Sequence, residues 1–363
     1  MTELSATETV PVTTTAAAPH ASNRAITLWL WVSAFMVFAM AVIGAITRLT
    51  ESGLSMVEWR PLIGALPPMT ETEWQRVFDL YRQSPEYQLK NSGMALEQFK
   101  SIFFWEWFHR LWGRTIGLVY GLPFFWFLLR RQIPTGYHGR LWLLLALGGL
   151  QGVIGWYMVM SGLVDRPSVS HYRLALHLGA ATLIFALLVH TAVRIGQIGK
   201  PLPTTIAPPS LVAHGWFGLA LVAMTIAWGA FVAGLDAGLF YNTFPLMNDS
   251  WLPTEIYDVR PLWLGLIDNP ALGQFTHRYL AMFTALVLAI LAIRGWRTLT
   301  LPLAARRLAL LVGAMALVQT GLGIATLLSQ VMIPLAALHQ AGALTLLALL
   351  VSLLTLLPRQ LNS

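Results

Sequence analysis

Four histidines form two pairs that could each bind the iron of one haem. His109 and His177 lie in the first half of the chain, and His277 and His339 in the second, each near the start of an apolar segment. Imidazoles from two neighbouring helices can ligate a haem iron from both sides. The chain has no cysteine, which excludes thiolate sites and covalent c-type haem attachment. The pattern therefore predicts two non-covalent haem sites.

The two histidine pairs belong to an internal repeat. The string EWFHR at residues 106–110 matches QFTHR at residues 274–278. A glutamine follows each of these histidines by 42 positions, at Gln151 and Gln319, and a glycine lies four residues further on in both halves. Agreement at this many positions is not coincidence. We expect a duplicated unit whose two copies place their histidines alike.

One carboxylate breaks the repeat. Glu106 lies one turn before His109, whereas the second half has the neutral Gln274 at the equivalent position. A carboxylate beside a haem can take or relay protons. We therefore assign catalysis to the first half, through Glu106, His109 and His177, and a held cofactor to the second. The alternative is that Glu106 is merely an acidic residue favoured at a helix start.

The arginines that follow two of the histidines are candidates for binding haem propionates. Arg110 and Arg278 could each form charge-assisted hydrogen bonds with a carboxylate. Interfacial snorkelling explains an arginine at such a position equally well. Three other histidines, His138, His190 and His214, lie near cytoplasmic loops and have no predicted role. His171 has no counterpart in the second half, and we expect it at the membrane interface near a haem propionate.

Composition indicates an integral membrane protein. The sequence is 56% hydrophobic and only 11% charged, with a mean hydropathy of +0.63, more apolar than a soluble domain. A net charge of +7 would favour nucleic-acid binding in a soluble protein. Here the basic residues lie in short loops between apolar segments, where they orient helices in the membrane. We therefore exclude nucleic acid as a partner.

Eight apolar segments are long enough to cross a bilayer as helices. The predicted fold is an all-α polytopic membrane protein with two tandem four-helix bundles. Since each half has an even number of spans, the halves share one orientation, and we expect a pseudo-two-fold axis along the membrane normal. The expected spans are residues 27–47, 112–130, 141–161, 172–193, 211–234, 274–293, 306–329 and 334–357.

Charge distribution sets the orientation of these spans. Basic residues follow spans two, four, six and eight, and the loops there contain no acidic residue. Those loops and both termini are therefore expected in the cytoplasm, with the four histidines toward the outer leaflet. The first residues do not resemble a transit peptide, which indicates a bacterial inner membrane.

The spans divide the chain into two halves with connecting segments. The N-terminal half, 27–195, is expected to hold the substrate site, and the C-terminal half, 211–357, the cofactor. A long outer loop, 48–108, has helical signals near 71–82 and 96–107 and could cap the first site. The remaining segments are a disordered cytoplasmic tail at 1–26, a linker at 196–210 and a short tail at 358–363.

Several strings in the sequence resemble the haem A synthase family over roughly residues 25–357. They are GAITRLTESGLSMVEWRPLIGALPP, FFWEWFHRLWGR, LALHLGA, FTHRY and LHQ, and the string around residues 106–114 is the most specific. The cysteine-free outer loop is similar to that of the alphaproteobacterial and mitochondrial branch. The resemblance implies oxidation of the C8 methyl group of haem O to a formyl group by successive hydroxylations, which gives haem A for cytochrome c oxidase.

The same resemblance implies roles for the repeated residues and for partners. A b-type haem would be ligated by His277 and His339, while Glu106, His109 and His177 would line the haem O site. Electrons would come from a ferredoxin-like donor, because the sequence has no flavin or nicotinamide fingerprint. Haem O synthase and oxidase assembly factors are further expected partners.

Three alternatives remain open on the residues alone. A di-haem electron-transfer subunit would hold two permanent haems, although both sites in one leaflet argue against a transmembrane wire. A haem transporter or chaperone would need the same duplicated bundle without catalysis. A di-iron carboxylate site requires two Glu-x-x-His motifs, and only Glu106 with His109 forms one.

Overall fold

The computed structural model describes residues 19–58, 63–164, 169–201 and 205–357. The predicted tail at 358–363 lies outside these ranges, and so does the part of the tail at 1–26 up to residue 18. The prediction of disorder was wrong for residues 19–26, which belong to the first long helix. Regular structure in the described chain is helical, with no strand beyond one isolated bridge. The long helices are α1 (Pro19–Leu49), α4 (Leu96–Leu129), α5 (His138–Val164), α6 (His171–Ile195), α7 (Pro209–Gly234), α9 (Pro270–Arg297), α10 (Leu303–Leu328) and α11 (Ile333–Leu356). The short ones are α2 (Glu71–Arg82), α3 (Pro85–Leu89) and α8 (Leu262–Asp268), with 3-10 turns at Ile63–Ala65, Ala237–Leu239 and Thr254–Ile256.

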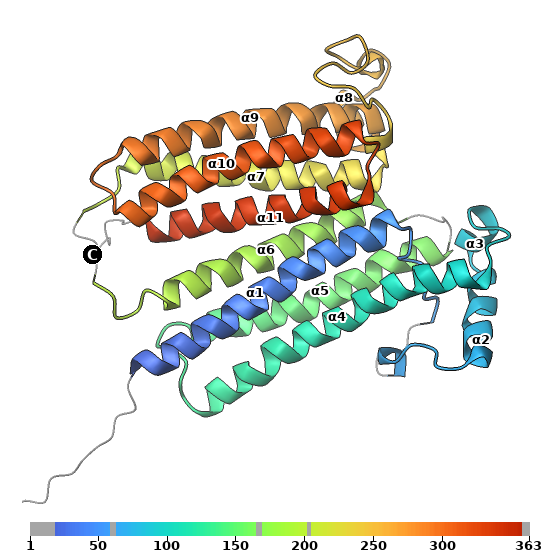
Figure 1. Ribbon diagram of the computed structural model, residues 1–363, viewed down its shortest axis with the longest axis horizontal. Helices are drawn as coiled ribbons and strands as arrows, with labels where there is room; N and C mark the ends of the chain where they lie inside the picture. The colour runs from blue at the N-terminus through green and yellow to red at the C-terminus, as the bar shows by residue number, and fades with distance from the viewer. Residues whose placement is uncertain (1–18, 59–62, 165–168, 202–204, 358–363) are drawn as a thin grey trace, which may run out of the picture.

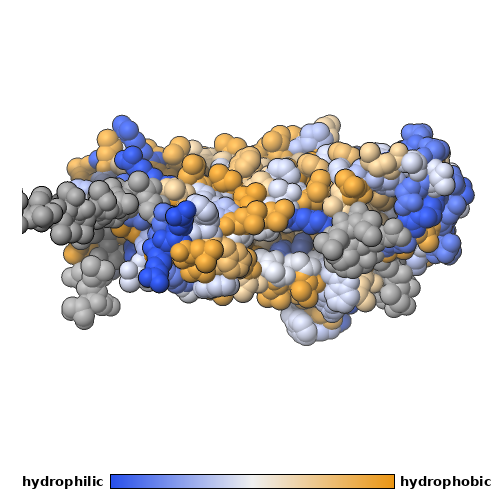
Figure 2. Space-filling view, turned by 90° about the horizontal axis from the view of Figure 1, so that it is seen from below, coloured by the Kyte–Doolittle hydropathy of each residue, from blue (hydrophilic) through white to orange (hydrophobic). Residues whose placement is uncertain are grey.

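Seven helices of the described chain are long and apolar enough to cross a membrane: α1, α5, α6, α7, α9, α10 and α11. The expected eighth span is the second part of α4, a 34-residue helix that runs beside the others (Figure 1). Arg114 lies within this part of the helix, and tryptophan, tyrosine, glycine and Pro123 also interrupt the apolar residues there, so its hydropathy is lower. In Figure 2, most apolar residues lie between two ends where hydrophilic residues gather. The chain is therefore a multi-pass membrane protein.

The long helices form two rings of four. In one ring α1 contacts α4 and α6, and α5 contacts the same two helices; in the other, α7 contacts α9 and α11, as does α10. The rings lie side by side through contacts of α6 with α7 and α11 and of α1 with α11 (Figure 1). Polar contacts also join them, since Arg48 of α1 forms an ion pair of 2.6 Å with Asp236 beyond α7.

The apolar core fills the end of the molecule that lies away from the histidines. Its side chains come from the first half of α1, α5, α7 and α10 and from the second half of α4, α6, α9 and α11. Because consecutive long helices run in opposite directions, these halves all lie at one end. Burial of this apolar surface stabilises the packing of the helices at that end. The opposite end, where the four histidines lie, is packed less densely with large apolar side chains.

A small helical cap covers the histidine end of the first ring. Trp74, Phe78 and Tyr81 lie on one face of α2 and pack against Phe99 and Phe103 of α4, with ring centroids about 5 Å apart. The predicted helix at 71–82 is confirmed by α2. The signal at 96–107 is also helical, but it continues without a break into the span, so that α4 belongs to both cap and bundle.

The cap contains a buried carboxylic acid whose protonation should control the cap's stability. Glu86 is only 3% exposed, and it accepts a hydrogen bond of 3.1 Å from the hydroxyl of Tyr81. Burial raises the pKa of Glu86 from 4.5 to about 7, because it outweighs the hydrogen bond from Tyr81 and the charge of Lys90, which both lower the pKa. The folded cap therefore binds this proton more tightly than the unfolded segment does, and its stability falls as pH rises from 4.5 to 7.

We expect Glu86→Gln to remove this pH dependence. A pKa difference of this size corresponds to about 3 kcal/mol above pH 7, so the variant cap should open less often at pH 8. Hydrogen exchange of the cap amides between pH 5 and 8, corrected for intrinsic exchange, measures this directly. Glu97→Gln, at a side chain that is 81% exposed, is the matched control. An unchanged pH dependence in Glu86→Gln would contradict this assignment.

Candidate functional site

Each ring of helices holds one of the predicted histidine pairs at the same end of the molecule. His109 lies on α4 and His177 on α6, while His277 lies on α9 and His339 on α11. All four helices begin at the end where α2, α3 and α8 lie (Figure 1). The imidazoles of His277 and His339 face one another with ring centroids 6.5 Å apart and planes at 89°.

The spacing of the second pair fits an iron between two imidazoles. Two metal–nitrogen bonds of about 2 Å each, plus about 1 Å from each nitrogen to its ring centre, require a centroid distance of about 6 Å. These residues therefore fit axial ligation of a haem.

Each of the four imidazoles is seated against a glycine of a neighbouring helix. A Cβ atom at these glycines would lie only 2.9–3.3 Å from an imidazole atom, closer than side chains normally approach. Two of these glycines, Gly155 and Gly323, are part of the sequence repeat, which gave them no role. The sequence analysis missed the other two, Gly44 and Gly229, for which the only signal is that each is followed by alanine near the end of the first helix of its ring. The pairs are Gly44 with His109, Gly155 with His177, Gly229 with His277 and Gly323 with His339.

The carboxylate that distinguishes the first half is buried beside its histidine. Glu106 is 3% exposed, and its Oε1 accepts a hydrogen bond of 2.5 Å from Nε of Arg110. In the second half Gln274 takes the same place and accepts from Arg278 at 2.8 Å. Each half thus has an arginine bonded to a side-chain oxygen four residues earlier, and this oxygen belongs to a carboxylate only in the first half. A buried carboxylate next to a histidine pair can hold or release a proton.

Both arginines also tie an outer segment to the bundle. Arg110 donates to the carbonyl of Met56 at 3.2 Å, and Arg278 donates to the carbonyls of Thr243, at 2.8 Å, and Tyr241. Their guanidinium groups therefore have a structural role that sequence reasoning had not foreseen. A role in binding propionates stays a prediction.

Glu106 and His109 do not stand at a helix start. α4 begins at Leu96, ten residues before Glu106, because the cap helix and the span are continuous. A favourable helix dipole falls off within the first turn and does not explain this residue. The alternative reading of Glu106 as a helix-start acid is therefore not supported.

The remaining histidines have other partners. His171 bonds to Asp268 of α8 at 2.8 Å and joins the two rings. His190 bonds to Thr355 at 2.8 Å, and His214 lies 2.9 Å from a guanidinium nitrogen of Arg294. His138 is the first residue of α5. The expected place of His171 near a haem propionate stays a prediction.

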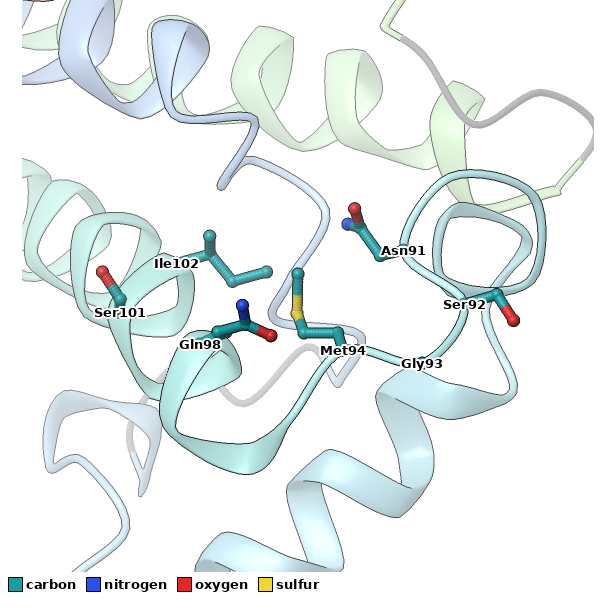
Figure 3. A pocket seen from close by; sticks show the side chains of 7 residues that line it. All are labelled: Asn91, Ser92, Gly93, Met94, Gln98, Ser101 and Ile102. Atoms are coloured by element: carbon teal, nitrogen blue, oxygen red, sulfur yellow. The ribbon is translucent and has the colours of Figure 1, made fainter.

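A metal centre and a hollow in the cap are the two other candidate sites. No group of three or more histidine or acidic side chains that could hold a metal ion occurs among the described residues. An open hollow lies in the cap between the segment after α3 and the start of α4 (Figure 3). Its lining contains neither histidine nor carboxylate, so it is separate from the histidine pairs.

Comparison with known proteins gives the family. A family model described as a cytochrome oxidase assembly protein matches residues 27–351, which include all four histidines and Glu106. The chain belongs to this family. Relatives in it that are named haem A synthase include those of Rhodospirillum centenum, 53% identical over 99% of this chain and 96% of the relative, and Parvibaculum lavamentivorans, 47% identical over 89% and 92%. The haem A synthase of Nitrosospira multiformis is 44% identical over 90% and 91%.

Proposed function

We propose that this chain acts as a haem A synthase, which oxidises the C8 methyl group of haem O to the formyl group of haem A. Each of two hydroxylations would insert one oxygen atom of O2 into a C–H bond of the methyl group, while two donor electrons and two protons reduce the other oxygen atom to water. The resulting hydrate would lose water to give the formyl group. Family membership and relatives that carry this name over almost their whole length support the proposal. The product would serve the assembly of cytochrome c oxidase.

The observation that carries the proposal is that only one of two equivalent histidine pairs has a buried carboxylate beside it. His277 and His339 would hold haem b, whose iron, when bound, supplies or stores an electron. His109 and His177 would hold the substrate haem O. Glu106, kept in place by Arg110, would take up and hand on protons during the oxidation. The neutral Gln274 suits a site that holds a cofactor without changing it.

We further propose that α4 is an eighth span, which completes two four-helix bundles related by a pseudo-two-fold axis along the membrane normal. Both termini would then be cytoplasmic, and the histidines would lie toward the periplasm of a bacterial inner membrane. The basic loops on the cytoplasmic side would suit an acidic, ferredoxin-like electron donor. Haem O synthase and oxidase assembly factors are the other expected partners.

The test is to express the chain in a bacterium that makes haem O but no haem A, and to identify extracted membrane haems by chromatography with mass detection. We expect haem A or its hydroxymethyl precursor, absent from cells without the chain. If folded, haem-loaded protein with an electron donor yields only haem O and haem B, the carrier or electron-transfer alternative holds instead.

A further inference from the structure

The two rings differ in how closely one pair of neighbouring helices packs. α9 and α10 of the second ring contact one another more than any other two helices of the described chain, whereas the equivalent α4 and α5 contact one another least among neighbours in the rings. A Cβ atom on Gly295 of α9 would lie only 2.6 Å from Cβ of Ala309, so small residues let α9 and α10 approach. The equivalent residues of the first ring are the larger Phe127 and Leu141. The other loosely packed pair, α7 and α11, is covered by α6, which contacts both helices.

The α4–α5 seam, formed by residues 106–127 of α4 and 141–156 of α5, is closed at both ends. At the end away from the histidines the hydroxyl of Tyr120 donates to the carbonyl of Leu141 at 2.8 Å. The rings of Phe124 and Trp142 lie 4.8 Å apart at the same end. At the histidine end the cap spans both helices, because α2 contacts α4 and α3 contacts α5. The loosely packed stretch therefore lies between these contacts, within the membrane-spanning part of the ring.

The side of α4 that faces the seam carries the proposed catalytic carboxylate. Phe124 contacts α5, and Gly117 and Glu106 precede it by 7 and 18 residues, which is about two and five helical turns. All three therefore lie on one side of α4, with Glu106 toward the histidine end. A Cβ atom on Gly117 would meet no atom of the described chain within 4 Å. The seam thus leads from the bilayer toward Glu106.

The facing side of α5 has glycines where α10 has side chains. Gly148 and Gly152 follow Leu141, which is buried where the two helices touch, by 7 and 11 residues, about two and three turns. Both glycines are exposed, and a Cβ atom on either would meet no atom of the described chain within 4 Å. The equivalent residues of α10 are Ala316, which is buried, and Thr320. In its apolar stretch α5 has only 6% of its residues buried, against 22% in α10.

From this difference between the rings we propose that the α4–α5 seam admits haem O from the bilayer and holds its isoprenoid chain. Haem O has the macrocycle of haem b but carries a farnesyl-derived chain in place of one vinyl group. A ring of close-packed helices has no space for such a chain, whereas the apolar interior of the bilayer accommodates it. The open ring is the one assigned to haem O, and the closed ring is assigned to haem b. The inference rests on the proposed function and adds the route of the substrate and the feature that separates the two sites.

The test replaces Trp156, toward the histidine end of the seam, by the photoreactive p-benzoylphenylalanine in the full-length protein with its haem b in lipid nanodiscs. Trp156 follows Gly152 by four residues and is 42% exposed. After addition of haem O and irradiation, we expect haem O to be attached covalently at position 156, as detected by mass spectrometry. The matched control is the same replacement of Ile324, at the equivalent position of α10, which should capture no haem O.

Filling the seam should exclude the isoprenoid chain. We expect Gly148→Leu combined with Gly152→Leu to lower both haem O capture and haem A output at least about tenfold, since even one misplaced methylene in an apolar site costs that much. The haem b content per protein should stay unchanged. Gly321→Leu of α10, where a Cβ atom also meets no atom of the described chain within 4 Å, is the control and should alter neither capture nor output.

Two results would overturn the proposal. If the parent protein makes haem A but position 156 captures no more haem O than position 324, the isoprenoid chain lies elsewhere. If the leucine variants keep the parent rate of haem A formation, the substrate does not enter through this seam. Failure of the proposed function looks different, because the parent protein would then make no haem A, whatever position 156 captures.

Discussion

Replacement of Glu106 by glutamine is expected to lower the rate of haem O oxidation by a factor of about 100 to 10,000, the usual contribution of a positioned acid or base. The carboxylate is buried 2.5 Å from Arg110 and is the one charge that distinguishes the first histidine pair from the second. The fold should not suffer, because Gln274 already forms the equivalent contact with Arg278 at 2.8 Å. Haem O and any hydroxylated intermediate should accumulate, as measured by a time course of extracted haems.

The comparison needs a control on the same helix. Glu97→Gln removes an exposed carboxylate of α4 that forms an ion pair of 2.8 Å with Lys100, and it should leave haem A output unchanged. The absorption spectrum of haem b should be the same in both variants. Normal haem A output from Glu106→Gln would refute the role of this carboxylate in proton transfer.

Replacement of His277 or His339 by alanine is expected to remove essentially all haem b from the purified protein. Their rings are 6.5 Å apart, the separation needed for one iron between them, and either substitution leaves only one axial ligand. Haem content per protein, from the pyridine haemochrome spectrum, measures the loss. Haem A production should fall to background in the same cells, since the second site would no longer hold its cofactor.

Two matched variants separate ligation from general damage to the bundle. His177→Ala lies at the equivalent position of the first half and should keep haem b while it loses the substrate haem. His190→Ala removes a histidine that is bonded to Thr355, and it should keep both. If His190→Ala and His339→Ala lost haem b to the same extent, the loss would reflect unfolding, and the ligand assignment would not stand.

Hydropathy and the repeat predicted much of the architecture. Long apolar segments must become helices in lipid, because each backbone polar group has to be bonded within its own segment. Seven of the eight predicted spans correspond to helices apolar enough to cross a membrane, and α2 lies where its sequence signal was. The predicted break between the outer loop and the second span was wrong, because nothing between residues 96 and 129 stops the helix and even Pro123 is accommodated within it.

The residues that hold the site in place were harder to predict. Gln151, Gln319 and two of the four glycines were visible as repeated positions, but their spacing alone does not show that each amide donates to a histidine carbonyl or that a missing Cβ makes room for a ring. Arg110 and Arg278 looked like propionate ligands, whereas their hydrogen bonds to carbonyls of the outer segments depend on where those segments return to the bundle. Such contacts join residues that are distant along the chain.

The sequence by itself determined that this is a helical membrane protein with two equivalent histidine pairs and one unmatched carboxylate. These properties follow from residue type and from periodicity, both of which are local. Only the tertiary structure decided that His277 and His339 face one another at 6.5 Å, that Glu106 is buried against Arg110, and that each imidazole rests on a glycine. Those distances depend on how four helices pack around one another, which is fixed by the summed burial of side chains along their whole length.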